Sequence, residues 1–462
     1  KYINRRWTLI SSGVEGFTSY SATFGYGNED KVGNPDYTAL VVREFNVTTQ
    51  TWSVTNTDSL QPNLTRCSGI KHFGCFIIGE DECSAEKSFW LGSINTDWHT
   101  GGNWCNGSVP DALQDVYIPA GTANQPIINT TANAATCRDL TIQAGASLTL
   151  SSSNLIHVKG DWILQGNFIS NQGTVILDGT VPQQMYGASV FCNLTINNPA
   201  GVTAHSNLQV NSILDMQSNN PSMSKGVLDM GENVLTMGSG AYTRGPGDVS
   251  GSIYRDYFVL DREYSFGNRY TRFYFEDVSG QDLPSTMLVK VTLGNAPDWR
   301  SYSGDTMMNA VRRLYEITIT GSEKFIPGIK FHYKDNEYAT GLNESNLSVW
   351  ILKNDSVKEL GQSEIDVTNN YLMVENINFG NISNFKLTVA PKKAPLLTWT
   401  GNYNKARTDW NMPQNWSPQY TPSSDFRLRI PATTYDPVLP PGASCVSLEI
   451  ASGGVLNTAT NA

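Results

Sequence analysis

The chain has 462 residues and a formal net charge of −10; 16% of its residues are charged and 10% are aromatic. One hydrophobic core rarely serves so long a chain, so roughly two to four domains are expected. The acidic balance argues against nucleic acid as a partner, because that partner requires a basic face. No apolar run reaches the length of about 18 residues that a membrane span needs, so no membrane span is predicted.

Residues 1–87 contain short segments in which β-branched and aromatic residues cluster or alternate, separated by Gly, Asn, Asp and Pro. Such segments, each followed by a turn signal, are typical of an antiparallel β-sandwich. Part of this segment is repeated later in the chain, because Arg5-Arg6 matches Arg312-Arg313, 307 positions on (312−5). The second copy carries additional strand-like sequence before its Arg-Arg pair, so the first copy is predicted to be a partial sandwich.

Residues 88–250 show a different pattern, a series of apolar pairs separated by one residue, such as Leu140/Ile142 and Leu148/Leu150. The spacing of about 3.6 residues that marks a helix is absent. Short strands of this kind, ended by Gly, Asn or Ser, are typical of a stacked β-coil. We therefore predict an all-β β-solenoid, as a right-handed parallel β-helix or a related β-roll. A second sandwich or an open meander uses the same triplets and stays an alternative.

The solenoid segment opens with a tryptophan-rich stretch that the chain repeats. Asp97-Trp98 matches Asp409-Trp410 and Asn103-Trp104 matches Asn415-Trp416, both 312 positions on (410−98, 416−104). The order of modules is therefore sandwich, solenoid, sandwich and the start of another solenoid. We expect a longer, concatenated protein, because this order amounts to about one and a half periods of the repeat. The predicted domains are residues 1–87, 88–250, 251–395 and 396–462.

The same stretch carries a resemblance to a known group of proteins. The pattern W-x-G…DW…NW…VP…D-x-x-IP…C-x-x-LTI-x-x-GASLTL, followed by FCNLTINNPAGVT, is similar to the β-strand repeat modules of large secreted or cell-surface proteins of Bacteroidetes. This resemblance implies type IX secretion, a location outside the cell, and a role as spacer, adhesin stalk, surface-layer part or filament. It implies no chemistry.

Three tryptophans of the stretch have two interpretations. Aromatic side chains beside Asn and Asp can form a platform that stacks on sugars. Alternatively, they cap the end of the solenoid and cover strand edges that would otherwise pair with other chains. We favour the cap, because the spacing recurs in both copies together with the turn residues. The residues are Trp90, Trp98 and Trp104, which line up with Trp399, Trp410 and Trp416.

The chain has seven cysteines, so at least one is unpaired. We predict a disulfide between Cys105 and Cys137, with burial of two small side chains as the alternative. The second copy has Ser417 in place of Cys105, so this bridge is not expected there. No Cys-x-x-Cys and no Cys/His cluster at metal spacing occurs in the sequence, so no zinc site is predicted. The pairing of Cys67, Cys75, Cys83 and Cys192 stays open.

Several acidic residues lie next to the apolar triplets. β-Helix enzymes that cleave polysaccharides use clustered carboxylates as acid and base. Carboxylates at coil corners more often bind local backbone N–H groups, which is the interpretation we favour. No cofactor is expected; an isolated surface calcium ion remains open. The carboxylates are Asp161, Asp178, Asp215 and Asp229, and the histidines, without any nucleophile motif, are His72, His99, His157, His205 and His332.

Three Asp-Ser/Thr-apolar triplets resemble the O-glycosylation signal of exported proteins in the same bacterial group. They place candidate sites at Ser59, Thr306 and Ser356.

These observations together predict a non-enzymatic structural repeat region of a large secreted surface or filament-forming protein, with further copies of itself as partners. A carbohydrate-binding adhesin module that contacts surface glycans or other surface proteins is the first alternative. A polysaccharide-cleaving β-helix enzyme is the second.

Overall fold

The computed structural model describes residues 1–14, 16–46, 51–80, 83–130, 134–218, 226–277, 282–305, 307, 309–338 and 343–458. The regular elements are strands, and the helical segments among these residues are 3₁₀ turns of three residues each. The predicted all-β class is therefore confirmed. The chain separates into two compact units, residues 1–220 with 227–248 and residues 221–226 with 249–462. The finer domain boundaries stay predictions.

The first unit begins with two antiparallel sheets that share one core, as predicted for a β-sandwich. The sheet orders are β3-β1-β8-β4-β5 and β2-β7-β6. Ile3, Phe24 and Phe76 come from both sheets and are at most 3% exposed. Alternation of inward and outward side chains along each strand makes such a core. The strands are β1 (Tyr2–Thr8), β2 (Tyr20–Gly25), β3 (Lys31–Val32), β4 (Leu40–Asn46), β5 (Thr51–Val54), β6 (Asn56–Gln61), β7 (Leu64–Ile70) and β8 (Cys75–Glu80).

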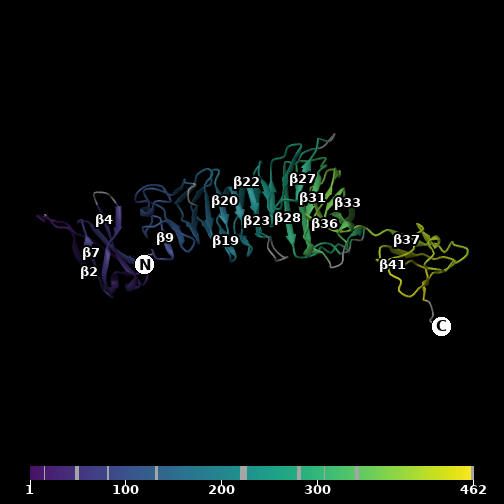
Figure 1. Cartoon of the computed structure of the whole chain (residues 1–462), viewed down its shortest axis with the longest axis horizontal. Helices are drawn as coiled ribbons and strands as arrows, with labels where there is room; N and C mark the ends of the chain where they lie inside the picture. Colours follow the sequence, from purple (N-terminus) through teal and green to yellow (C-terminus); the bar gives the residue numbers. More distant parts are fainter. Residues whose placement is uncertain are drawn as a thin grey trace. The chain divides into compact units, whose positions relative to one another are not determined.

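The rest of the first unit is a β-solenoid, in which parallel strands of successive coils lie side by side (Figure 1). Val116 pairs with Leu140, Leu140 with Trp162, and Trp162 with Met185, so successive coils take 24, 22 and 23 residues (140−116, 162−140, 185−162). This stack consists of β9 (Lys87–Phe89), β10 (Asp115–Ile118), β13 (Leu140–Ile142), β16 (Trp162–Leu164), β19 (Gln183–Tyr186), β21 (Val202–Ala204) and part of β23 (Leu228–Met237).

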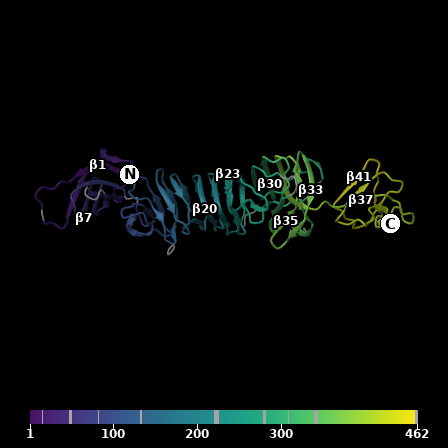
Figure 2. The same ribbon diagram turned by 90° about the horizontal axis from the view of Figure 1, so that it is seen from above.

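Two further stacks of parallel strands complete the coils of the solenoid, which Figure 2 shows from above. Parallel pairing between coils excludes the sandwich and meander alternatives for this segment. The second stack holds β12 (Ala135–Cys137), β15 (Leu155–Val158), β18 (Thr174–Leu177), β20 (Ser189–Ile196), β22 (Leu208–Met216) and β24 (Tyr242–Arg244). The third holds β11 (Ile127–Ile128), β14 (Ser147–Leu150) and β17 (Asn167–Ile169), and the first halves of β20 and β22 pair in the same way.

The predicted apolar pairs fill the interior of the solenoid. Leu140 and Ile142 are fully buried, whereas Thr141 between them points outward. Leu148 and Leu150 repeat the arrangement on the third stack. Each such side chain contributes roughly 1.5–3 kcal/mol by leaving water. The pairing of triplets across coils therefore builds a continuous core along the stack.

The second unit contains a larger sandwich. One sheet has the order β26-β27-β31-β35-β34, and the other joins β25, β28, β30, β36, β32 and β33 in antiparallel pairs. The bounds are β25 (Val249–Arg255), β26 (Arg262–Ser265), β27 (Arg272–Phe275), β28 (Thr286–Leu293), β30 (Arg313–Thr320), β31 (Gly328–His332), β32 (Leu347–Lys353), β33 (Ser356–Gly361), β34 (Glu364–Asp366), β35 (Tyr371–Val374) and β36 (Asn384–Pro391).

The last module of the second unit starts another coil. Its β37 (Leu396–Trp399) pairs in parallel with β39 (Arg427–Ile430), which pairs in parallel with β41 (Ser447–Ile450). Short β38 (Trp416–Ser417) pairs with β37, and β40 (Val438–Leu439) pairs with β42 (Asn457–Thr458). This order repeats that of β9, β10 and β13 in the first unit.

Candidate functional site

The tryptophan-rich stretch forms a buried aromatic cluster at the start of the first solenoid. Trp90, Trp98 and Trp104 are 0%, 0% and 1% exposed. The ring of Trp104 packs edge-to-face against both others, with centroid distances of 4.9 Å to Trp90 and 4.7 Å to Trp98. Edge-to-face packing adds to the stability that burial of the rings gives. Because no ring face is open to solvent, these residues cannot form a sugar-stacking platform, and the cap interpretation accounts for their position.

Two of the three indole N–H groups donate hydrogen bonds to backbone carbonyls. Trp90 Nε1 donates to the carbonyl of Asn124 at 2.6 Å, and Trp104 Nε1 donates to the carbonyl of Trp98 at 2.7 Å. Gly92 adopts a φ of +58°, and a Cβ there would collide with the Asn124 carbonyl. The glycine of the Trp-x-Gly pattern is thus required by both conformation and close approach.

Asn103 is the polar centre of the cap. Its side chain is fully buried. Its Oδ1 accepts from the backbone N–H groups of Ile94 and Asn95 at 2.9 and 3.1 Å. Its Nδ2 donates to Asn95 Oδ1 at 2.8 Å and to the Asp97 carbonyl at 2.9 Å. A buried amide with its donors and acceptor engaged holds the connecting loop in one conformation.

The second copy reproduces this geometry. Trp416 Nε1 donates to the Trp410 carbonyl at 2.8 Å, and Trp399 Nε1 donates to the Tyr435 carbonyl at 2.7 Å. The ring centroids of Trp399 and Trp416 lie 5.0 Å apart. Asn415 is fully buried and donates to the Asp409 carbonyl at 2.9 Å, as Asn103 does to Asp97. The two stretches are therefore the same structural element, which we call the Trp/Asn cap.

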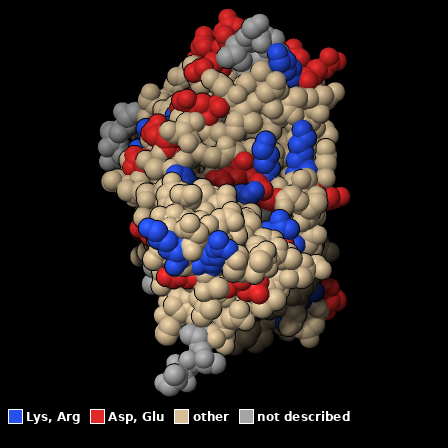
Figure 3. Space-filling model, turned by 90° about the vertical axis from the view of Figure 1, so that its right-hand side faces the viewer, with Lys and Arg blue, Asp and Glu red and all other residues tan. Residues whose placement is uncertain are grey.

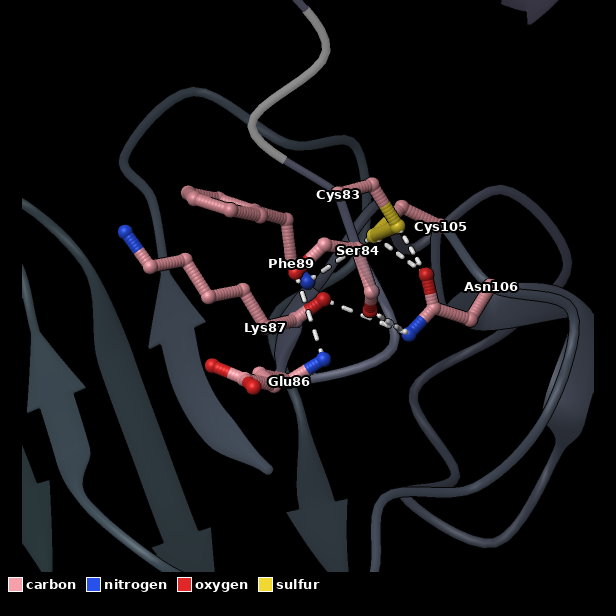
Figure 4. The surroundings of a disulfide bond; sticks show 7 residues. All are labelled: Cys83, Ser84, Glu86, Lys87, Phe89, Cys105 and Asn106. Carbon is pink, nitrogen blue, oxygen red and sulfur yellow. Dashed lines mark hydrogen bonds between the residues drawn. A yellow bond between two sulfur atoms is a disulfide. The ribbon is translucent and has the colours of Figure 1, made fainter. Parts of the chain in front are cut away.

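The disulfide of the first cap joins Cys83 to Cys105, with the Cα atoms 6.0 Å apart (Figure 4). The predicted partner of Cys105 was wrong, because Cys137 is a free, buried cysteine. Cys137 ends β12, where alternation turns its side chain into the solenoid interior, and burial raises the pKa of its thiol. Beside the disulfide, Asn106 Nδ2 donates to the carbonyls of Ser84 and Lys87 at 3.0 and 3.2 Å.

A line of carboxylates at one corner of the solenoid connects successive coils. Asp115 Oδ1 accepts from the backbone N–H of Asp139 at 3.4 Å. Asp139 Oδ1 accepts from Asp161 N at 2.7 Å, and Asp161 Oδ1 accepts from Gln184 N at 2.7 Å. Burial raises the pKa of Asp139, partly offset by the hydrogen bond from the Asp161 amide, and the neighbouring carboxylates raise it further. We call Asp115, Asp139 and Asp161 the corner ladder.

The first member of the corner ladder has a basic partner. Arg138 binds both carboxylate oxygens of Asp115, through Nε at 2.6 Å and Nη2 at 2.9 Å. This bidentate pair raises the pKa of the Arg138 guanidinium. The arginine is 42% exposed and the aspartate 10%, so the pair closes the corner toward solvent.

The other acidic candidates engage local partners. Asp178 accepts from His157 Nδ1 at 2.8 Å and from Lys159 Nζ at 2.7 Å. Burial acts to raise the pKa of Asp178, but these two contacts prevail and lower it. Asp215 pairs with Arg244, at 2.7 Å, and Asp229 accepts from the backbone N–H of Gly231 at 3.2 Å.

The remaining histidines have separate surroundings. His332 Nδ1 lies 2.9 Å from the Asn370 carbonyl, and His205 stacks on Tyr186 with a centroid distance of 4.6 Å. His99 lies beside Asp97 in the cap, with 3.7 Å between the Nδ1 and carboxylate atoms. His72 contributes its backbone carbonyl to the Tyr20 hydroxyl at 2.8 Å.

Two of the three candidate glycosylation residues lie within the described chain. Ser59 is in β6 and half-buried, whereas Ser356 is exposed at the start of β33. Thr306 lies outside the described residues. Ser356 is therefore the more accessible of these two candidate residues.

Charged residues make up 16% of the sequence. On the face seen in Figure 3, basic and acidic side chains are interspersed among uncharged ones. Within the described residues, no group of three or more His, Cys, Asp and Glu side chains is placed to hold a metal ion. None of the described helical segments has the length and hydropathy that crossing a membrane requires.

The comparison with known protein families matches only part of the chain. Residues 89–185 match a family model described as "Domain of unknown function (DUF8693)". The match begins at Phe89, next to the first tryptophan of the Trp/Asn cap, and ends within β19. Searches of curated proteins and of solved structures returned no match. Fold and site therefore define a modular all-β protein in which a Trp/Asn cap precedes each run of parallel coils.

Proposed function

We propose that the chain is a non-enzymatic structural repeat region of a large secreted bacterial cell-surface protein, serving as a rigid stalk or assembly module. One observation carries the proposal: the Trp/Asn cap is built twice with equivalent buried tryptophan rings and with the same Trp–Trp and Asn–Asp hydrogen bonds. An element that recurs with these bonds and buries its aromatic faces marks the start of a module. A ligand site would expose some of that surface.

The contacts between successive coils of the solenoid support a mechanical role. Each coil contacts mainly the coil before and after it, so stacked coils resist bending and extension through many parallel hydrogen bonds. The corner ladder adds side-chain bonds between coils at Asp139 and Asp161. Carboxylates that bind backbone N–H groups at corners and turns commonly serve the backbone, which supports the structural role over the polysaccharide-cleaving one.

The disulfide supports a location outside the cytoplasm. Disulfides persist in oxidising compartments, and the pair Cys83–Cys105 ties the chain segment before β9 to the loop after Trp104. We extend the proposal to export by the type IX route in Bacteroidetes, on the resemblance of the repeat pattern. Further copies of the repeat are the proposed partners, and Ser59 and Ser356 the proposed glycan carriers. No observation favours a carbohydrate-binding site on the described residues.

Single-molecule stretching of the chain, held at its two ends, tests the stalk function. We expect the solenoid to keep its length until it ruptures cooperatively, and Trp104→Ala to lower the rupture force. The matched control Tyr186→Ala removes an exposed ring and leaves that force unchanged. Gradual extension at low force would contradict a rigid stalk, and turnover of a polysaccharide by the purified chain would contradict the non-enzymatic proposal.

Location is tested separately on cells. Antibody against the chain should label intact bacteria, and brief protease treatment of the cells should remove the label. Protection of the protein until the cells are lysed would contradict a surface location.

A further inference from the structure

The disulfide between Cys83 and Cys105, shown in Figure 4, closes a loop of the chain that includes the first Trp/Asn cap. The two cysteines are 22 residues apart, and the buried side chains of the cap all lie between them in the sequence. A covalent bond between the ends of this loop carries tension past it, so a pull that reaches Cys83 passes directly to Cys105. The enclosed side chains are Trp90, Trp98, Asn103 and Trp104.

The second cap has the same construction without this bridge. Ser417 takes the position of Cys105: it pairs with Thr398 of β37, and the Cys105 N–H donates to the Phe89 carbonyl of β9 at 3.0 Å. The indole N–H of Trp416 still makes its 2.8 Å hydrogen bond there, and the ring is buried. The bridge is therefore not needed to shape a cap, and its contribution lies in the chain segment that it fastens.

The fastened segment leads into β9, the first strand of the solenoid. The three residues of β9 pair with β10, and before them a tight turn joins the Ser84 N–H to the Lys87 carbonyl at 3.1 Å. The coil at the end of a stack has a neighbouring coil on one side, so tension from that end unwinds it before the inner coils. Without the bridge, the cap is therefore the part of the solenoid that the load reaches first.

The bridge is open to chemical reduction. Cys83 and Cys105 are both half-buried, so a small dithiol reaches their sulfur atoms. Its thiolate attacks one sulfur and forms a mixed disulfide, and its second thiol then displaces the protein sulfur. The reaction transfers two electrons and two protons, and it leaves two protein thiols and the reductant as a cyclic disulfide. This change acts on the first cap and not on the second, which has Ser417 in place of Cys105.

We infer that the Cys83–Cys105 bridge is a redox-gated lock on the length of the solenoid under load, an inference that rests on the proposed stalk function. When the bridge is intact, residues 84–104 cannot lengthen, because the covalent bond carries the tension. When it is reduced, this segment is pulled out before the inner coils unwind. The added length is roughly 70 Å, from 22 residues at about 3.4 Å each less the 6.0 Å between the two Cα atoms.

Single-molecule stretching of the full chain, with and without dithiothreitol, tests this inference. With the reductant we expect an additional extension of roughly 70 Å that precedes the cooperative rupture of the solenoid. Without the reductant this early extension should be absent. The order of events is decisive, because any reduced disulfide adds the length of its loop to the fully unfolded chain.

Two cysteine variants are the controls, both stretched without reductant. Cys105→Ser removes the bridge and gives the first cap the residue that the second cap has at Ser417, so the variant keeps a cap that folds. We expect this variant to show the early extension. Cys192→Ser replaces a free cysteine in β20 and should behave as the natural oxidised chain does.

Two outcomes would overturn the inference. One is release of the added length only during rupture of the solenoid, both in the reduced chain and in Cys105→Ser. The other is an early extension of the same size in the oxidised natural chain. Neither outcome affects the stalk function, whose failure has a different signature: gradual extension of the whole chain at low force, with and without dithiothreitol.

Discussion

Trp104 donates its indole N–H to the backbone carbonyl of Trp98, six residues earlier, at 2.7 Å, and both side chains are buried. The same bond joins Trp416 to Trp410 at 2.8 Å. One side chain thus fills the interior of a coil and fixes the backbone of the loop that leads to it. This pair gives the Trp/Asn cap its defined geometry, and it can be tested by substitution.

Replacement of Trp104 by Phe keeps an aromatic ring but removes the N–H donor. We expect a loss of about 1–3 kcal/mol in the free energy of unfolding, because the buried Trp98 carbonyl is left without its partner. Trp104→Ala should cost about 3–5 kcal/mol, because it also leaves a cavity. Urea unfolding of the first unit measures both values. Equal stability of the Phe variant and the natural chain would show that the hydrogen bond is unimportant.

Replacement of Asn103 by Ala leaves two backbone N–H groups, of Ile94 and Asn95, without their acceptor. We expect a loss of about 1–3 kcal/mol for each group that stays buried. The matched variant Asn415→Ala should destabilise the second unit and leave the first unit unaffected. Hydrogen exchange of the two loops separates these effects, and faster exchange in the wrong unit would contradict the equivalence of the caps.

Reduction of the disulfide should destabilise the first unit alone. Cys83 and Cys105 are 22 residues apart, a closure that stabilises by about 3 kcal/mol in the chain-entropy account. Cys83→Ser should have the same effect as reductant, whereas Cys192→Ser should have little effect. Peptide mapping without reduction should recover residue 83 linked to residue 105, and a fragment that links Cys105 to Cys137 would contradict the pairing.

Asp139→Asn should stabilise the first unit at neutral pH. The folded state raises the pKa of this carboxyl, so between the unfolded and folded pKa values the native chain binds more protons, and its stability falls as pH rises. The amide keeps an acceptor for the Asp161 N–H and removes the half-buried charge. The advantage over the natural chain should be largest above the folded pKa and should shrink as pH falls through it.

Asp178→Asn should change the stability of the same solenoid in the opposite direction. Its contacts with His157 and Lys159 lower the pKa of Asp178, so the charged form stabilises the fold above the unfolded pKa and this contribution is lost as pH falls through the folded one. We therefore expect Asp178→Asn to lower the thermal midpoint at pH 7. A shift of the same direction in both variants would show that burial alone governs these carboxylates.

Arg313→Ala should destabilise the second sandwich by about 3–5 kcal/mol, because it leaves the Glu337 charge buried and unpaired. The equivalent Arg6→Ala removes an exposed side chain and should change stability by less than about 0.5 kcal/mol. Urea titration of each variant measures the difference. A large effect of Arg6→Ala would show that the first sandwich already buries this residue in solution.

The sequence alone determined the class of structure and its modular order. Alternating apolar residues predicted strands, the triplets predicted coils, and the recurring Asp97-Trp98 and Asn103-Trp104 pairs located the start of each solenoid. These features follow from local periodicity, because the side-chain period of a strand is two and the burial of one face requires alternation. The exact recurrence of Asn103 at Asn415 was also a signal for its structural role.

Which residues come into contact depends on the three-dimensional fold. The partner of Cys105 is Cys83 because β12 turns Cys137 into the interior, a direction that spacing between cysteines does not reveal. The corner ladder joins each aspartate to a backbone N–H one coil later, at a separation set by coil length and not by a motif. Sequence periodicity states which face a side chain takes, whereas the partner on that face depends on how many residues each coil contains.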